Sequence, residues 1–249
     1  MLYHCGTLTY TKVGLDGLFA FLLWGDFCYT IMQTVVPSIL PLKLKSLGAS
    51  NLTLGIIMTA MPSLLNMTVC PYASFKSDRC RSRFGRRLPF IFFTLPFLCL
   101  SLVGLGYGEA IANFLRGQIE WIAQGSPAAA TLLVLGLFMT AYQFFDMFVA
   151  SVFCYVFNDV VPVALLGRFL GAFRIVGGLA AALYNYFIFK YAESHMSIIF
   201  LGSAALYFAG IGAMCLFVKE GKYPPLDEAE KKASRGFAGV KSFFSESFS

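Results

Sequence analysis

Long apolar runs separated by short polar segments make up most of the chain. An α-helix needs about 20 predominantly apolar residues to cross a bilayer core about 30 Å thick. Six runs approach or exceed that length, at about 17–40, 51–74, 89–107, 128–157, 170–190 and 197–218. The segments between them are too short to form a separate soluble domain. The pattern therefore predicts an all-α integral membrane protein with six transmembrane helices.

Composition excludes the class of water-soluble enzymes. Of the 249 residues, 58% are hydrophobic and 13% are charged, whereas a soluble domain carries about 25% charged residues. The seven cysteines lack paired spacing, and the two histidines belong to no Cys/His cluster with metal-ligand spacing. The sequence also shows no nucleophile–base pair. We therefore expect no enzymatic activity, no cofactor and no metal site.

The 19 Lys and Arg residues are distributed unevenly between the two sides of the predicted bundle. Fifteen fall in the N-terminal tail, the second and fourth connections and the C-terminal tail, while Lys43, Lys45, Arg116 and Lys190 fall on the other side. Because cytoplasmic loops are enriched in Lys and Arg, both termini are predicted to be cytoplasmic. This placement accounts for the net charge of +6, so we expect no nucleic-acid partner.

Two polar segments are candidates for surface helices. Residues 109–124 place apolar side chains on one helical face and charges on the other, which predicts a short amphipathic helix on the outer interface. The segment 219–249 is polar and contains a second such stretch. Packing or capping is the simpler interpretation of both. We accordingly divide the chain into a transmembrane domain, 1–218, and a cytoplasmic tail, 219–249.

The second connection, residues 74–91, reads SFKSDRCRSRFGRRLPFI. Asp78 can cap a helix or pair with an arginine, and Gly85 allows the chain to reverse sharply. Arg86 and Arg87 can bind carboxylates, helix C-termini or lipid phosphates. A plain positive anchor would explain these charges. It would not explain the spacing D-R-x-x-x-x-x-G-R-R-x-P, which begins at Asp78 and Arg79.

That spacing resembles the loop between helices two and three of the major facilitator superfamily. It is most similar to the glycoside–pentoside–hexuronide (melibiose-type) symporters and the related sucrose-type carriers. WGDFCYT at 24–30 and YQFFD at 142–146, the latter followed by Asp159, resemble the first and fourth helices of the same family. The resemblance implies one half of a major facilitator fold, a 3+3 inverted repeat, working by alternating access between two halves.

Asp26 and Asp146 lie inside otherwise apolar spans. A carboxylate at a helix centre costs about 2.5–3.5 kcal/mol on insertion scales, so it seldom lacks a partner or a function. Counting from Lys12 and from Asp159 places both at a similar depth near the midplane, where carriers bind substrate. We expect at least one of them to bind substrate or a proton. The alternatives are a buried protonated acid and a structural pair with Arg174.

Polar and aromatic side chains accompany the two aspartates on their helical faces. They are Thr30, Gln33, Tyr142 and Gln143, with Trp24 and Tyr29 as further candidate rings. Carboxylates, amides and hydroxyls beside aromatic rings suit a sugar. The resemblance implies that Asp26 and Asp146 contact sugar and that Arg174 assists, although its register is displaced. Core packing is an equally good interpretation of Gln33, Tyr142 and Gln143 taken singly.

The second span bears on coupling, because sodium-coupled relatives carry carboxylates there as oxygen ligands. The run 51–74 contains none. Proton coupling is therefore favoured, with an intramembrane aspartate as the carrier and little or no dependence on sodium.

A cytoplasmic gate is a further hypothesis. Asp159, Arg168 and Arg174 in the fourth connection would form salt bridges with Asp78 and Arg79 in the second.

A complete carrier of this superfamily has twelve spans, so the chain resembles an N-terminal half that needs a C-terminal half or a second copy. We expect a sugar–proton symporter, or its N-terminal half, in the plasma (cytoplasmic or inner) membrane, with lipid, sugar and proton as partners. The alternatives are an efflux or other solute carrier of the same fold, and a non-transporting receptor or scaffold derived from a carrier half.

Overall fold

The computed structural model describes residues 3–80, 82, 85–119 and 124–221. Six helices within these ranges are long and apolar enough to cross a membrane, which confirms the predicted spans. They are Lys12–Ser46, Asn51–Asp78, Leu88–Gly106, Pro127–Val160, Val163–Tyr191 and Met196–Phe217. The predicted tail beyond 221, and the positions 120–123 of the predicted amphipathic segment, lie outside the described residues.

Four of the spans are single α-helices and two contain irregular turns. α1 (Lys12–Ser46), α4 (Leu88–Gly106), α7 (Pro127–Val160) and α9 (Met196–Phe217) are continuous. The second span joins α2 (Asn51–Gly55), the π-helical turn η1 (Ile56–Ala60) and α3 (Met61–Asp78). The fifth joins α8 (Val163–Leu183), the π-helical turn η2 (Tyr184–Ile188) and the 3-10 turn η3 (Phe189–Tyr191). α1 is longer than its apolar run because Thr11 caps its N-terminus, accepting a hydrogen bond from the Gly14 backbone N–H at 3.2 Å.

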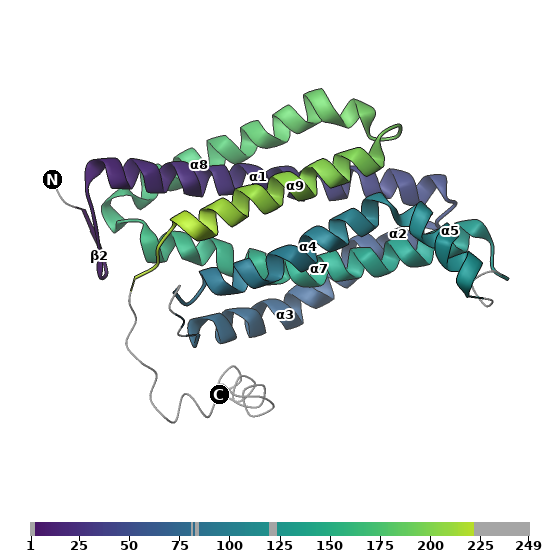
Figure 1. Ribbon diagram of the computed structural model, residues 1–249, viewed down its shortest axis with the longest axis horizontal. Helices are drawn as coiled ribbons and strands as arrows, with labels where there is room; N and C mark the ends of the chain where they lie inside the picture. The colour runs from purple at the N-terminus through teal and green to yellow at the C-terminus, as the bar shows by residue number, and fades with distance from the viewer. Residues whose placement is uncertain (1–2, 81, 83–84, 120–123, 222–249) are drawn as a thin grey trace.

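The helices lie side by side in one bundle (Figure 1). α1 packs against α8 and α9, α9 packs against α4, and α7 packs against α4 and α3. The order across the bundle is therefore α8, α1, α9, α4, α7, α3. We call the end that holds residues 3–10 and 218–221 the proximal end. The end that holds α2 and α5 (Gly108–Gln118) is the distal end (Figure 1).

Burial is concentrated in the middle of this order. In the most apolar stretches of α1, α4 and α9, 44–50% of the residues are buried, against 6% in the second span and 11% in the fifth. The α3 and α8 spans therefore flank the bundle and present most of their apolar side chains outward. Such faces suit hydrocarbon or another membrane protein, not water.

Two short elements stand outside the spans. A β-hairpin of β1 (Tyr3–Cys5) and β2 (Leu8–Tyr10) precedes α1, and the sequence analysis did not anticipate it. The predicted amphipathic helix forms as α5. Its small residue Ala112 is buried against Ala130 and Val134 of α7, whereas Phe114 is 69% exposed. Packing on α7, the simpler of the two interpretations, is what the structure shows.

The closest contact between α1 and α9 depends on Gly210. A Cβ atom at this position would collide with the side chain of Cys28, so only a glycine lets the two helices approach this far. We expect Gly210→Ala to destabilise the fold by about 1–3 kcal/mol through overpacking. Thermal unfolding in detergent measures the effect. Gly202→Ala on the same helix is the matched control, because a Cβ there has nothing within 4 Å; equal losses in the two variants would contradict the prediction.

Candidate functional site

A cavity of about 290 Å³ lies between α1, α7 and α8, well inside the membrane-spanning part of the bundle. Its charged members are Asp26 of α1 and Arg174 of α8, and Tyr29, Phe153 and Phe173 supply aromatic rings. Gly177 and Gly178 form part of its wall. The cavity thus combines hydrogen-bonding groups of both charge signs with flat apolar surfaces.

Asp26 is 2% exposed and only partly satisfied. Its Oδ1 accepts a hydrogen bond from Thr30 Oγ1 at 3.5 Å, whereas Oδ2 has no hydrogen-bond partner among the described residues. Arg174 acts on this carboxylate electrostatically, but the two form no ion pair. Because a buried polar atom without a partner is costly, the open Oδ2 is a ready acceptor for a donor that enters the cavity.

Gly177 sets the size of the cavity beside this acid. A Cβ at Gly177 would lie 3.4 Å from Thr30 Oγ1 and 3.5 Å from Asp26 Oδ2, so α8 passes Asp26 at van der Waals distance. Any side chain larger than alanine at this position would occupy the space next to the carboxylate.

Asp146 of α7 is 3% exposed and has a different environment. Gln33 Nε2 of α1 donates to both of its carboxylate oxygens, at 2.8 and 2.7 Å, and lies 2.9 Å from the Tyr29 hydroxyl. The hydroxyl groups of Tyr142 and Tyr207 lie within electrostatic reach of the carboxylate and have no hydrogen-bond partner in the described structure. Among the described residues, Asp146 is therefore held by the Gln33 amide and by no cation.

Tyr29 connects the two aspartates, since its side chain lines the Asp26 cavity and its hydroxyl contacts Gln33. The structure thus gathers Asp26, Arg174, Gln33 and Tyr142, all predicted from the sequence, around two adjacent centres. Gln143 is half-buried and takes part in neither. Trp24 is 48% exposed and stacks on Phe27, so its ring is not part of the cavity. Phe153 and Phe173 were missed, because phenylalanines in an apolar helix carry no signal of their own.

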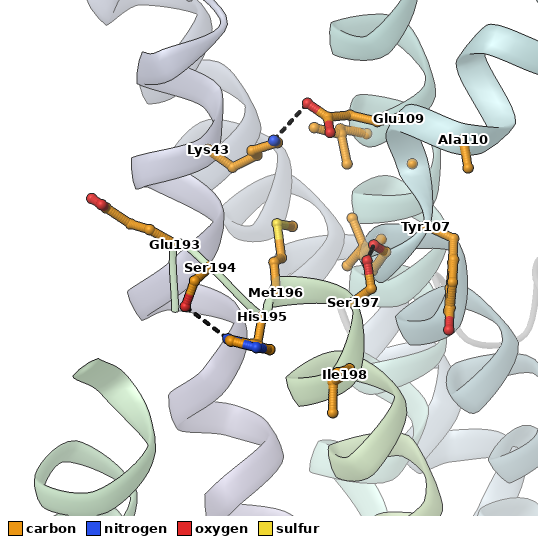
Figure 2. Close-up of a pocket in the computed structure, with 14 residues that line it drawn as sticks. Lys43, Tyr107, Glu109, Ala110, Glu193, Ser194, His195, Met196, Ser197 and Ile198 are labelled. Atoms are coloured by element: carbon orange, nitrogen blue, oxygen red, sulfur yellow. Dashed lines mark hydrogen bonds and ion pairs between the residues drawn. The ribbon is translucent and has the colours of Figure 1, made fainter. Parts of the chain in front are cut away.

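A second cavity, of about 350 Å³, lies at the distal end where α1, the start of α5 and the start of α9 meet (Figure 2). Lys43 Nζ and Glu109 Oε1 form an ion pair of 2.5 Å across it, which joins α1 to α5. Ser194 and His195 hydrogen-bond at 2.7 Å in the exposed turn before α9. Within the described ranges, no group of three His, Cys, Asp or Glu side chains is placed to hold a metal ion.

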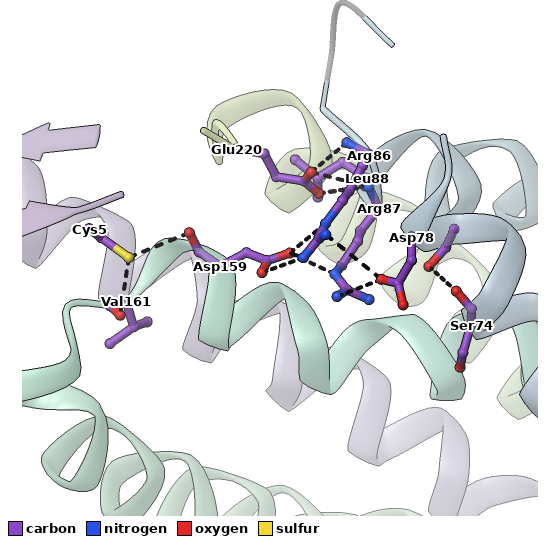
Figure 3. Close-up of polar contacts among 10 residues, drawn as sticks. Cys5, Ser74, Asp78, Arg86, Arg87, Leu88, Asp159, Val161 and Glu220 are labelled. Atoms are coloured by element: carbon purple, nitrogen blue, oxygen red, sulfur yellow. Dashed lines mark hydrogen bonds and ion pairs between the residues drawn. The ribbon is translucent and has the colours of Figure 1, made fainter. Parts of the chain in front are cut away.

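The proximal end carries a network of charges (Figure 3). Arg86 Nη2 and Arg87 Nε contact the two carboxylate oxygens of Asp159 at 2.9 and 2.6 Å. Arg87 Nη2 also pairs with Asp78 at 2.9 Å. The ends of α3, α4 and α7 are thereby joined through two arginines and two aspartates.

Glu220 completes this network from beyond α9. Its carboxylate accepts hydrogen bonds from the backbone N–H groups of Arg86, Arg87 and Leu88, at 2.6, 3.1 and 2.8 Å (Figure 3). These groups form the start of α4, where free N–H groups and the helix dipole favour an anion. Gly85 makes this possible: its φ is +109°, and a Cβ there would meet the Glu220 side chain.

The β-hairpin is attached to the same end through Cys5, whose Sγ–H donates to the carbonyl oxygens of Asp159 and Val161 at 3.5 and 3.4 Å. Burial, and then the charge of Asp159, raises the pKa of the Cys5 thiol above its ordinary value. The thiol therefore keeps its proton at neutral pH and can act as the donor.

The pairing within this network differs from the sequence hypothesis. Asp159 and Asp78 of the hypothesis do belong to the network, but their ion-pair partners are Arg86 and Arg87. Arg168 and Arg174 are not part of it, because Arg168 lies on the exposed side of α8 and Arg174 lies farther along that helix, at the Asp26 cavity. Arg79 stacks on Phe75 with 3.7 Å between its guanidinium carbon and the ring centroid. Arg81 and Arg83, also matched to the motif, lie outside the described residues. Glu220 and Cys5 were missed, since nothing in their local sequence indicates partners more than 130 residues away.

Comparison with known proteins identifies a protein family that this chain matches. A family model described as MFS/sugar transport protein matches residues 21–248. The general alpha-glucoside permease of Schizosaccharomyces pombe is 26% identical over 208 residues, which are 78% of this chain and 35% of the permease. The chain therefore spans about a third of the length of this relative. No solved structure matches the chain.

Substitution of Gly85 tests the Glu220 contact. We expect Gly85→Ala to lower stability by more than about 2 kcal/mol, because it adds a strained positive φ to the displacement of Glu220 from three N–H groups. Gly48→Ala is the control: its φ is +79° with nothing near the added Cβ, so only the backbone strain of about 1–2 kcal/mol applies. Thermal unfolding in detergent compares them, and a smaller loss for Gly85→Ala than for Gly48→Ala would refute the contact.

Proposed function

The chain belongs to the MFS/sugar transport protein family, and on that premise we propose that it is the substrate-binding half of a sugar–proton symporter. It is a multi-pass membrane protein of a transporter family and not of an enzyme family. The proposal gives it a second half, either a C-terminal one or another copy, in the plasma membrane. The outward apolar faces of α3 and α8 support such a partner, with lipid covering what remains.

The cavity at Asp26 carries the proposal. It offers an unsatisfied carboxylate oxygen, a guanidinium group and three aromatic rings inside an apolar bundle. A sugar presents hydroxyl groups that donate to a carboxylate and accept from a guanidinium, and C–H faces that pack on rings. We assign Asp26, Arg174 and Tyr29 to sugar binding. The name of the yeast relative makes α-glucosides the first sugars to test.

Asp146 is the proposed proton carrier. It is buried, and its hydrogen bonds come from Gln33, with no cationic partner among the described residues. A carboxyl group of this kind can take up and release one proton, and Tyr29 and Gln33 connect it to the sugar cavity. The second span, Asn51–Asp78, has no carboxylate before its terminal Asp78, which argues against a sodium site there.

We propose that the proximal end is cytoplasmic and that its network is a gate. The loop and tails at this end contain most of the Lys and Arg residues. The Asp78, Asp159, Arg86 and Arg87 pairs hold three helix ends together, so breaking them would free α3 to move. Since Asp78 is half exposed whereas Asp159 is mostly covered, the Asp78 pair is the one open to exchange with a second half.

Uptake assays test the sugar and proton assignments. In cells that express the protein at its natural length, we expect α-glucoside uptake with proton entry, unchanged when sodium is replaced at fixed pH. Asp26→Asn should lower sugar uptake and sugar exchange by at least about tenfold, the value of a lost charged hydrogen bond. Asp146→Asn should keep exchange and lose proton-driven accumulation.

A matched pair of variants tests the role of Asp146 as the proton carrier. Gln33→Leu removes the amide that binds Asp146, whereas Gln143→Leu makes the same change at a half-buried position with no described hydrogen bond. Only Gln33→Leu should reduce sugar accumulation.

Normal accumulation by Asp146→Asn, or a requirement for sodium, would contradict proton coupling. Net export instead of uptake would favour an efflux carrier, and binding without transport would favour a receptor.

The gate assignment makes a separate prediction. Asp78→Asn removes the charge that Arg87 contacts at 2.9 Å but leaves Arg87 its contact with Asp159. We expect transport to slow several-fold while sugar affinity in the outward-facing state stays unchanged, because the cavity is remote from the proximal end. Equilibrium sugar binding and initial uptake rates, measured on the same membranes, decide the point. An equal loss of both would count against a gate.

A further inference from the structure

An aromatic groove of about 580 Å³ lies outside both sites described above, on the flank of the bundle where α3 and α4 each pack against α7. Aromatic rings make up most of its lining. They are Tyr72, Phe90, Phe93, Phe144, Phe145 and Phe148. Thr94 also lines the groove, and its hydroxyl is already bonded to the carbonyl oxygens of Phe90 and Ile91. The wall of the groove therefore offers apolar contact and little else.

One charge lies at the edge of this apolar groove. Lys76, in the last turn of α3, belongs to the lining and is exposed, with its ammonium group 5.9 Å from the Tyr72 ring centroid. No carboxylate in the described structure forms an ion pair with it. Lys76 therefore stands where the apolar groove meets the proximal, charged end of the bundle.

The surroundings of Lys76 are basic even after the pairs at the proximal end are counted. Residues 76–87 contain six Lys or Arg and one acid, Asp78. Asp159 and Glu220 bring two further carboxylates to this end. Four of the six basic residues, Lys76, Arg79, Arg86 and Arg87, lie within the described structure, where they meet three negative charges. Lys76 forms no ion pair there, so the excess positive charge lies beside an apolar groove at the end of a membrane-spanning helix. This is the combination that attracts an anionic lipid, with its phosphate on the lysine and its acyl chain on the rings.

We propose that the α3–α4–α7 groove binds one anionic glycerophospholipid. The lipid phosphate contacts the Lys76 ammonium, and an acyl chain lies along the rings of Phe93, Phe144 and Phe148. A zwitterionic lipid would fit the same groove but would gain less from Lys76. The bound lipid would connect α3 to α4 beside the Asp78 and Arg87 pair, independently of any transported solute.

Native mass spectrometry of the full chain, released from nanodiscs of phosphatidylcholine and phosphatidylglycerol, tests the site. The protein should retain one phosphatidylglycerol in preference to phosphatidylcholine. Lys76→Gln should lower that preference about fivefold, the effect of one basic residue near an anionic surface. Both leaflets contain the anionic lipid, so the result does not depend on which end of the bundle is cytoplasmic.

Two controls separate this site from general lipid contact. Lys45→Gln removes an exposed lysine at the distal end and should leave the preference unchanged. Phe93→Ala should weaken retention of either lipid, whereas Phe92→Ala, an exposed neighbour that does not line the groove, should not. Equal retention of the two lipids by the unaltered protein, or equal effects of Lys76→Gln and Lys45→Gln, would overturn the proposal. Loss of the adduct on addition of a tail peptide or second half would mean that protein covers the groove.

Discussion

The hydrocarbon core of a membrane leaves no water for polar groups, and this constraint explains where the polar side chains of the bundle lie. Asp146 meets it fully, because Gln33 supplies hydrogen bonds to both of its oxygens. Asp26 meets it only in part, since one of its oxygens faces a cavity and has no described partner. Of these two buried acids, Asp146 is therefore held by the fold, whereas Asp26 is open to a ligand. The functional proposal follows from that division.

The proximal network gives the bundle its second organising feature. Three helix ends converge on Asp78 and Asp159 through two arginines, and Glu220 ties the end of α9 to the start of α4. The hairpin adds a contact from Cys5 to the end of α7. The first and last described segments are therefore both attached to the residues of this network or to their neighbours. A bundle closed in this way can move as one body, which is what the proposed alternating access between two halves would require.

The sequence predicted what depends on local pattern and missed what depends on distance. Hydropathy located all six spans, because a transmembrane helix must be apolar along its whole length. It also identified Asp26 and Asp146, since charges stand out in apolar runs. It could not assign partners: the fourth connection with Asp159 was expected to pair with Asp78 and Arg79, whereas Asp159 pairs with Arg86, because which side of a helix meets which loop is decided only by packing. The π-helical turns and the hairpin have no comparable signal, so they were not anticipated.

The cap that Glu220 places on α4 also has a consequence for how the protein is made. The backbone groups it binds belong to residues translated 132–134 positions earlier. At about 5–20 residues per second, roughly 7 to 27 seconds pass between synthesis of the start of α4 and synthesis of Glu220. For about the first half of that interval, until Asp159 is made 72–73 residues after them, Arg86 and Arg87 also lack their carboxylate partner. The start of α4 therefore receives its cap only after the last helix, α9, has been made.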